Sequence, residues 1–273
     1  MTAEQRPQRV VAVDWSGAAT ASGRGIWLAD VDAGSLELRD LRGGWTRDAV
    51  APHLADLAAA QPQLAVGLDF AFSLPAWFLQ ERGYATAAQL WDDVETCERW
   101  VRECPAPFWG RGAQPTRPVS LDPGQRLRRT AKEVFETYRV RPKSVFQLGG
   151  AGTVGTGSLR GMRALSRLRA HGFAVWPFDS PRLPVVVEIY PRLMTDGTRL
   201  SDAASRRAFL DRQRWPERME SRVVASNDRN AFDAAVSALA MAGHAGELGA
   251  LPPARDRTDQ LEGRIWAPHP AGS

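Results

Sequence analysis

Cysteine and lysine are scarce in this 273-residue chain, and long hydrophobic runs are absent from it. The two cysteines, Cys97 and Cys104, fit the spacing of neither a CxxC metal knuckle nor a redox pair, so we expect free thiols. No stretch approaches the roughly 18 consecutive apolar residues that a membrane span requires. The polar start of the chain lacks the pattern of a signal peptide. We therefore expect a soluble, cytoplasmic protein.

Several catalytic signatures are also missing. No G-x-S-x-G nucleophile elbow stands near a plausible triad, and the four histidines show no metal-ligand spacing. The glycine-rich residues 149–157 match neither a P-loop nor a dinucleotide fingerprint. They precede an expected helix, whose amino end could bind a phosphate with help from Arg160. A flexible loop is nevertheless the favoured interpretation of this segment.

Positive charge is present, and it is almost all arginine. Only Lys132 and Lys143 are lysines among the 35 basic residues, and the net charge is +4. This charge is compatible with a polyanionic partner. An arginine- and alanine-rich composition also follows from a GC-rich genome, so charge alone does not identify nucleic acid as the partner.

The spacing of apolar residues predicts an α/β fold. Three strands, a helix and a fourth strand open the chain, and the right-handed crossover rule makes strand four parallel to strand one, in the order 3-2-1-4. Residues 75–161, approximately, are interpreted as a helical and loop insertion in a single domain that spans residues 1–273. The expected strands are 9–15, 25–31, 35–40, 64–70, 173–178, 185–190 and 263–266, and the expected helices are 48–60, 86–103, 127–138, 159–170, 202–215 and 230–242.

Three of the apolar runs end in a carboxylate, namely Asp14, Asp69 and Glu188. An ionised carboxylate is costly to bury unless another group compensates its charge. One such residue is usually a helix cap or half of an ion pair. Three at equivalent strand ends would repel one another, and a divalent cation resolves that repulsion. Ligands that are all oxygen favour Mg²⁺ or Mn²⁺.

A fourth candidate carboxylate, Asp233, lies in an alanine-rich helix. The small residues would let this helix lie close against the sheet, with Asp233 directed at the metal cluster. The alternative is an ordinary exposed helical aspartate. Asp228 is a weaker candidate, better explained as a first-turn acid favoured by the helix dipole. Asn230 shares a helix face with Asp233.

These motifs, taken in order, resemble a known family: the predicted nucleases of ribonuclease H-like fold that are grouped as a domain of unknown function. The matching pieces are residues 13–17, 67–75, 188–191, 230–235 and 262–268. The resemblance implies a ribonuclease H-like mixed sheet of order 3-2-1-4-5 flanked by helices. It also implies that Asp14, Asp69, Glu188 and Asp233 are catalytic metal ligands, and that the protein hydrolyses nucleic-acid phosphodiester bonds with two metal ions.

Five further residues are candidates for substrate contact beside Arg160. Ser16 and Gly17 could offer backbone N–H groups to a phosphate, although a simple turn explains them equally well. Trp109, Arg111 and Arg117 combine aromatic and guanidinium groups, as single-strand binders do. Each of the five stays a candidate on the sequence alone.

Two other functions remain open. Residues 14–20 faintly resemble the first phosphate loop of the actin and sugar-kinase group, which would make the protein an ATP-dependent phosphotransferase. The length of the chain argues against this, because those proteins place two such domains around the nucleotide. The other alternative is a non-catalytic nucleic-acid or nucleotide-binding module whose acids hold a structural cation.

Overall fold

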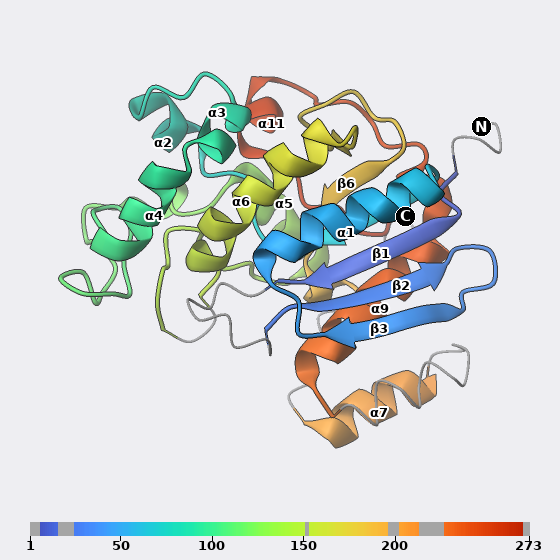
Figure 1. The fold of residues 1–273 in the computed structure, drawn as a ribbon. Coiled ribbons are helices and arrows are strands. Elements are labelled where there is room, and N and C mark those ends of the chain that lie inside the picture. Colours follow the sequence, from blue (N-terminus) through green and yellow to red (C-terminus); the bar gives the residue numbers. More distant parts are fainter. Residues whose placement is uncertain (1–5, 16–24, 151–152, 196–201, 213–226, 270–273) are drawn as a thin grey trace.

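The computed structural model describes residues 6–15, 25–150, 153–195, 202–212 and 227–269. At its centre is a mixed sheet with helices on both faces (Figure 1). The strands are β1 (Arg9–Asp14), β2 (Trp27–Asp32), β3 (Leu38–Gly43), β4 (Leu64–Leu68), β5 (Ala174–Val175) and β6 (Val185–Glu188). They follow the order β3-β2-β1-β4-β6-β5.

The first four strands have the predicted order and directions. β1 pairs antiparallel with β2 and parallel with β4, and β3 completes the antiparallel meander. The predicted order 3-2-1-4-5 is not confirmed beyond β4, because two strands follow instead of one. β6 pairs with β4, and the two-residue β5 lies outside β6. All four residues of β6 are buried, as expected of the longer apolar strand in the inner position.

Ten α-helices surround the sheet in the described part of the chain. They are α1 (Arg47–Ala60), α2 (Ala76–Glu81), α3 (Ala87–Asp92), α4 (Val94–Glu103), α5 (Arg129–Tyr138), α6 (Gly155–Ala170), α7 (Ala203–Arg212), α9 (Arg229–Gly243), α10 (Ala245–Leu248) and α11 (Arg257–Glu262). The predicted helix 86–103 is two helices, because Asp93 ends α3 and caps α4 by accepting a hydrogen bond from Thr96 N–H at 3.1 Å. α2, α10 and α11 were not predicted. They have only 6, 4 and 6 residues, which is too short for apolar residues to show a helical period. The end of the predicted helix 202–215 lies outside the described residues.

Two helical layers enclose the sheet. In Figure 1, α1 and α6 lie in front of it and α9 lies behind. Val11 and Val66 face the α1 and α6 layer, together with Phe78 and Phe146 from the predicted insertion. Val10 and Ala12 face the α9 layer. Among the described helices, none combines the length and apolarity needed to cross a membrane.

The alanine-rich helix α9 lies close to the sheet, as its composition predicts. Ala231, Ala234, Ala235 and Ala238 are at most 1% exposed. The contact is close enough to require glycine on the strand side: a Cβ at Gly67 in β4 would lie 2.5 Å from Met241 Sδ of α9. This packing brings the start of α9 to the end of the sheet where β1 and β4 finish.

Candidate active site

The carboxyl ends of three parallel strands form one edge of the sheet. β1 ends at Asp14, β6 ends at Glu188, and Asp69 directly follows β4. The register pairs Val13 with Leu68 and Leu68 with Glu188. The three carboxylates therefore stand at neighbouring strand ends, as the sequence predicts, and such an edge is where open α/β sheets bind ligands.

Burial and neighbouring charges raise the pKa values of Asp14 and Asp69. Burial raises the pKa of Asp14 well above its usual range, and the negative charges of Asp69 and Asp233 add to this effect. Burial and the charge of Asp233 raise the pKa of Asp69 to about 8. A side-chain hydrogen bond between Asp14 and Asp69 raises the pKa of Asp14 and lowers that of Asp69. Positive charge is therefore more favourable here than at isolated carboxylates.

Asp233 has 23% of its side chain accessible. Burial raises its pKa to about 6, and the nearby guanidinium of Arg229 limits the increase. Arg229 Nε lies 3.4 Å from Asp233 Oδ2, one helical turn away on α9. Arg229 therefore favours the ionised form of Asp233.

Asp228 also acts on this site, which the sequence interpretation did not anticipate. It is the N-cap of α9 and accepts hydrogen bonds from Asn230 N–H at 2.7 Å and Ala231 N–H at 3.3 Å. Its charge nevertheless raises the pKa of both Asp14 and Asp233. Asp228 is the N-cap and precedes the first helical residue, Arg229. Helical spacing therefore does not determine on which side of α9 it lies relative to Asp233.

The negative charge of Glu188 is compensated by a directly hydrogen-bonded arginine. Arg128 Nη1 donates to Glu188 Oε2 at 2.8 Å, and Arg128 Nη2 donates to Glu188 Oε1. Phe72 N–H donates to Glu188 Oε2 at 2.9 Å. A carboxylate has about four acceptor positions, and these bonds fill three of them. Glu188 is thus half of a buried ion pair, and its Oε1 can still accept one more hydrogen bond or bind one cation.

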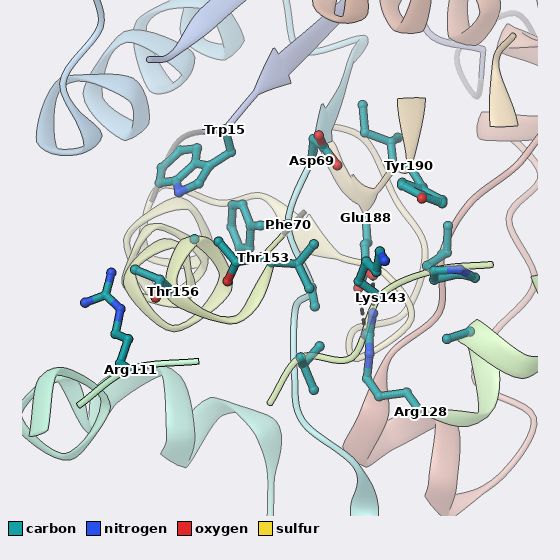
Figure 2. A pocket seen from close by; sticks show the side chains of 18 residues that line it. Trp15, Asp69, Phe70, Arg111, Arg128, Lys143, Thr153, Thr156, Glu188 and Tyr190 are labelled. Atoms are coloured by element: carbon teal, nitrogen blue, oxygen red, sulfur yellow. Dashed lines mark hydrogen bonds and ion pairs between the residues drawn. The ribbon is translucent and has the colours of Figure 1, made fainter. Parts of the chain in front are cut away.

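A cavity of about 430 Å³ opens beside this edge (Figure 2). Asp69 and Glu188 form part of its wall, and Trp15, Phe70 and Tyr190 supply aromatic surface. Its basic residues are Arg111, Arg128 and Lys143. Arg128 and Lys143 were not predicted as site residues, because neither lies near a candidate acid in the sequence. A cavity of this size, with aromatic walls and a few charged groups, is typical of a binding site.

Three of the six predicted substrate residues lie away from this cavity. Arg111 lines the cavity, whereas Trp109 packs against the core and Arg117 is exposed on the same loop. Arg160 pairs with Glu98 at 3.0 Å, in a separate hollow of about 160 Å³. Residues 16 and 17, the predicted Ser16 and Gly17, lie outside the described residues.

The three aspartates fit a divalent cation by their chemistry. Their oxygens are the ligands that Mg²⁺ and Mn²⁺ prefer, and their mutual repulsion is the kind that a bound cation relieves. Across the described ranges, no three His, Cys, Asp or Glu side chains already stand in a metal-binding arrangement. Glu188 could add one oxygen to such a site while it keeps its bonds to Arg128.

Comparisons of the chain with protein-family models, with curated proteins and with solved structures found no match. The family resemblance therefore stays a prediction from the motifs. The ligand roles of Asp14, Asp69, Glu188 and Asp233 stay predictions as well.

Proposed function

We propose that the protein is a divalent-metal-dependent nuclease that hydrolyses phosphodiester bonds of nucleic acid. One observation carries the proposal: aspartates from three separate segments meet at the end of the sheet beside a cavity, where burial raises the pKa of each and the charge of Asp233 raises those of Asp14 and Asp69 further. Such a group is typical of sites that hold cations or protons for catalysis. The order and directions of β1 to β4 support a ribonuclease H-like fold for the proposal.

In the proposed site, Asp14, Asp69 and Asp233 hold Mg²⁺ or Mn²⁺, and Oε1 of Glu188 contributes to the same cluster. The bound ions supply an activated water molecule and stabilise the leaving oxygen. Arg229 keeps Asp233 ionised at neutral pH, so that this carboxylate is ready to bind a cation. Arg128 fixes the orientation of Glu188.

The test is cleavage of labelled single-stranded, duplex, hybrid and branched nucleic acids with Mg²⁺ or Mn²⁺. The intact protein is compared with Asp14→Asn, and with Asp56→Asn on the exposed side of α1 as the matched control. We expect cleavage that chelator and Asp14→Asn abolish and Asp56→Asn leaves unchanged. Mn²⁺ binding that depends on Asp14, without cleavage of any substrate, would contradict the nuclease proposal. It would favour nucleotide phosphotransfer or a binding role.

A further inference from the structure

We infer that the cavity beside the aspartates binds one nucleoside monophosphate unit, with its phosphate held by Arg111 at the start of α6. This rests on the proposed function, since it names the part of the substrate that enters the site. The volume of about 430 Å³ lies in the range of small-molecule sites, about 300 to 1,000 Å³. It accommodates one nucleotide and not a length of duplex.

Arg111 and Lys143 are the two cations of the cavity that lack a counter-charge. Arg111 Nε donates to Leu148 O at 2.9 Å, which fixes the side chain. Its two terminal nitrogens have no hydrogen-bond partner among the described residues, and Lys143 has neither an ion-pair nor a hydrogen-bond partner there. Lys132, by contrast, donates to Gly124 O at 2.7 Å. Figure 2 draws Lys143 on the side of Glu188, away from Arg111. The unpaired guanidinium of Arg111 can therefore attract a phosphate on its own side of the cavity and form charge-assisted hydrogen bonds with it.

The backbone around Arg111 is built to hold this side chain in place. Leu148 N–H donates to Trp109 O at 2.7 Å, which ties the Arg111 loop to residues 147–149. A Cβ at Gly149 would lie 2.0 Å from Gly110 O, so only glycine allows the two segments to approach this closely. The position of Arg111 therefore results from a specific backbone contact.

The start of α6 lines the same cavity. Thr156 and Gly157 lie in the first turn of this 16-residue helix, and no side chain caps it. Trp15 is 8% exposed, and its indole N–H has no partner in the part of the chain that the structure describes. Figure 2 shows Trp15 on the side of the cavity where α6 begins, near Thr156 and Arg111. Uncapped amide groups, an unpaired indole N–H and the guanidinium of Arg111 make this side suited to an anion.

Asp69 and Glu188 line the cavity away from Arg111 (Figure 2). A strand whose terminal phosphate reaches Arg111 would place its next phosphodiester bond toward these carboxylates. Hydrolysis there breaks one P–O bond and joins the oxygen of water to phosphorus. One proton of the water goes to the leaving oxygen and the other goes to solvent. The product is one nucleotide released from the end of the strand.

The first test measures AMP binding by calorimetry on protein treated with chelator, so that catalysis plays no part. We expect Arg111→Ala to weaken binding about tenfold or more, as loss of a hydrogen bond to a charged group does. The matched controls are Arg102→Ala, whose ion pair with Glu103 is exposed, and Lys132→Ala. They should bind AMP as the intact protein does. The inference is overturned if AMP does not bind, or if all three variants bind it equally.

The second test separates this inference from the nuclease proposal. Single strands of one sequence are offered with Mn²⁺ as 5′-phosphorylated, 3′-phosphorylated, unphosphorylated and covalently circular forms. We expect one phosphorylated linear form to be cut fastest, with single nucleotides as product, and the circle to stay intact. Equal cleavage of the circle would reject the terminal-nucleotide inference and leave the nuclease in place. AMP binding that depends on Arg111, with no strand cut, would reject the nuclease and retain the subsite.

Discussion

Arg128 binds both carboxylate oxygens of Glu188, and each of the two side chains is only 3% exposed. Arg128→Met would leave the charge of Glu188 buried without a partner, so we expect a loss of about 3 to 5 kcal/mol in the free energy of unfolding. The double variant Arg128→Met with Glu188→Leu removes both charges and should recover most of that loss. Urea denaturation measures both values. A double variant as unstable as the single one would show that the pair matters through shape and not through charge.

The aspartate cluster predicts that stability falls as pH rises. The pKa values of Asp233 and Asp69 are raised from 3.8 to about 6 and about 8, so the folded chain binds their protons more tightly than the unfolded chain does. This contribution is fully present below about pH 4 and is lost as pH rises through 6 and 8. Each group contributes a slope of up to about 1.4 kcal/mol per pH unit. Urea denaturation between pH 5 and pH 9 would follow the decline.

Asp69→Asn should make the fall of stability with rising pH less steep, because it removes the carboxyl group with the pKa of about 8. The exposed Asp56→Asn should leave it unchanged. Under the proposed function, Mn²⁺ should raise the melting temperature more at pH 8 than at pH 5, since protons and the cation compete for the same oxygens. If stability depends on pH in the same way in Asp69→Asn and in the intact protein, the raised pKa of Asp69 is contradicted.

Gly67 sets the distance between β4 and α9. A Cβ at this position would lie 2.5 Å from Met241 Sδ and 2.8 Å from Ile189 Cγ2, so Gly67→Ala forces the helix or its side chains to move. We expect a loss of about 1 to 3 kcal/mol in stability and a smaller Mn²⁺-induced rise in melting temperature, because Asp233 lies on the same helix. Gly243→Ala, at the end of α9 with no atom within 4 Å of the added Cβ, is the matched control. Its stability should equal or exceed that of the intact protein. Equal melting temperatures for the two variants would show that the contact is not restrictive.

Local patterns were enough to predict the strand ends that carry Asp14 and Asp69 and the close packing of α9. In both cases the signal lies in adjacent residues: an apolar run that stops at an acid, and a helix rich in alanine. The pairing of Arg128 with Glu188 has no such signal, because the partners are 60 positions apart and come from unrelated elements. The same holds for Lys143, which reaches the cavity from a loop. The position of β6 between β4 and β5 depends on tertiary packing, which the order of strands along the chain does not specify.

Glu262 connects the last part of the described chain, by hydrogen bonds, to elements that are synthesised much earlier. Its Oε1 accepts from Ala76 N–H at 2.8 Å, 186 positions away, and its backbone oxygen accepts from Arg128 Nη1 at 2.8 Å. Ile265, three residues later, forms part of the cavity wall. A ribosome adds about 5 to 20 residues per second, so roughly 10 to 40 seconds separate the synthesis of Ala76 from that of Glu262. The growing chain therefore carries Asp14 and Asp69 well before Ile265 is added to the cavity wall.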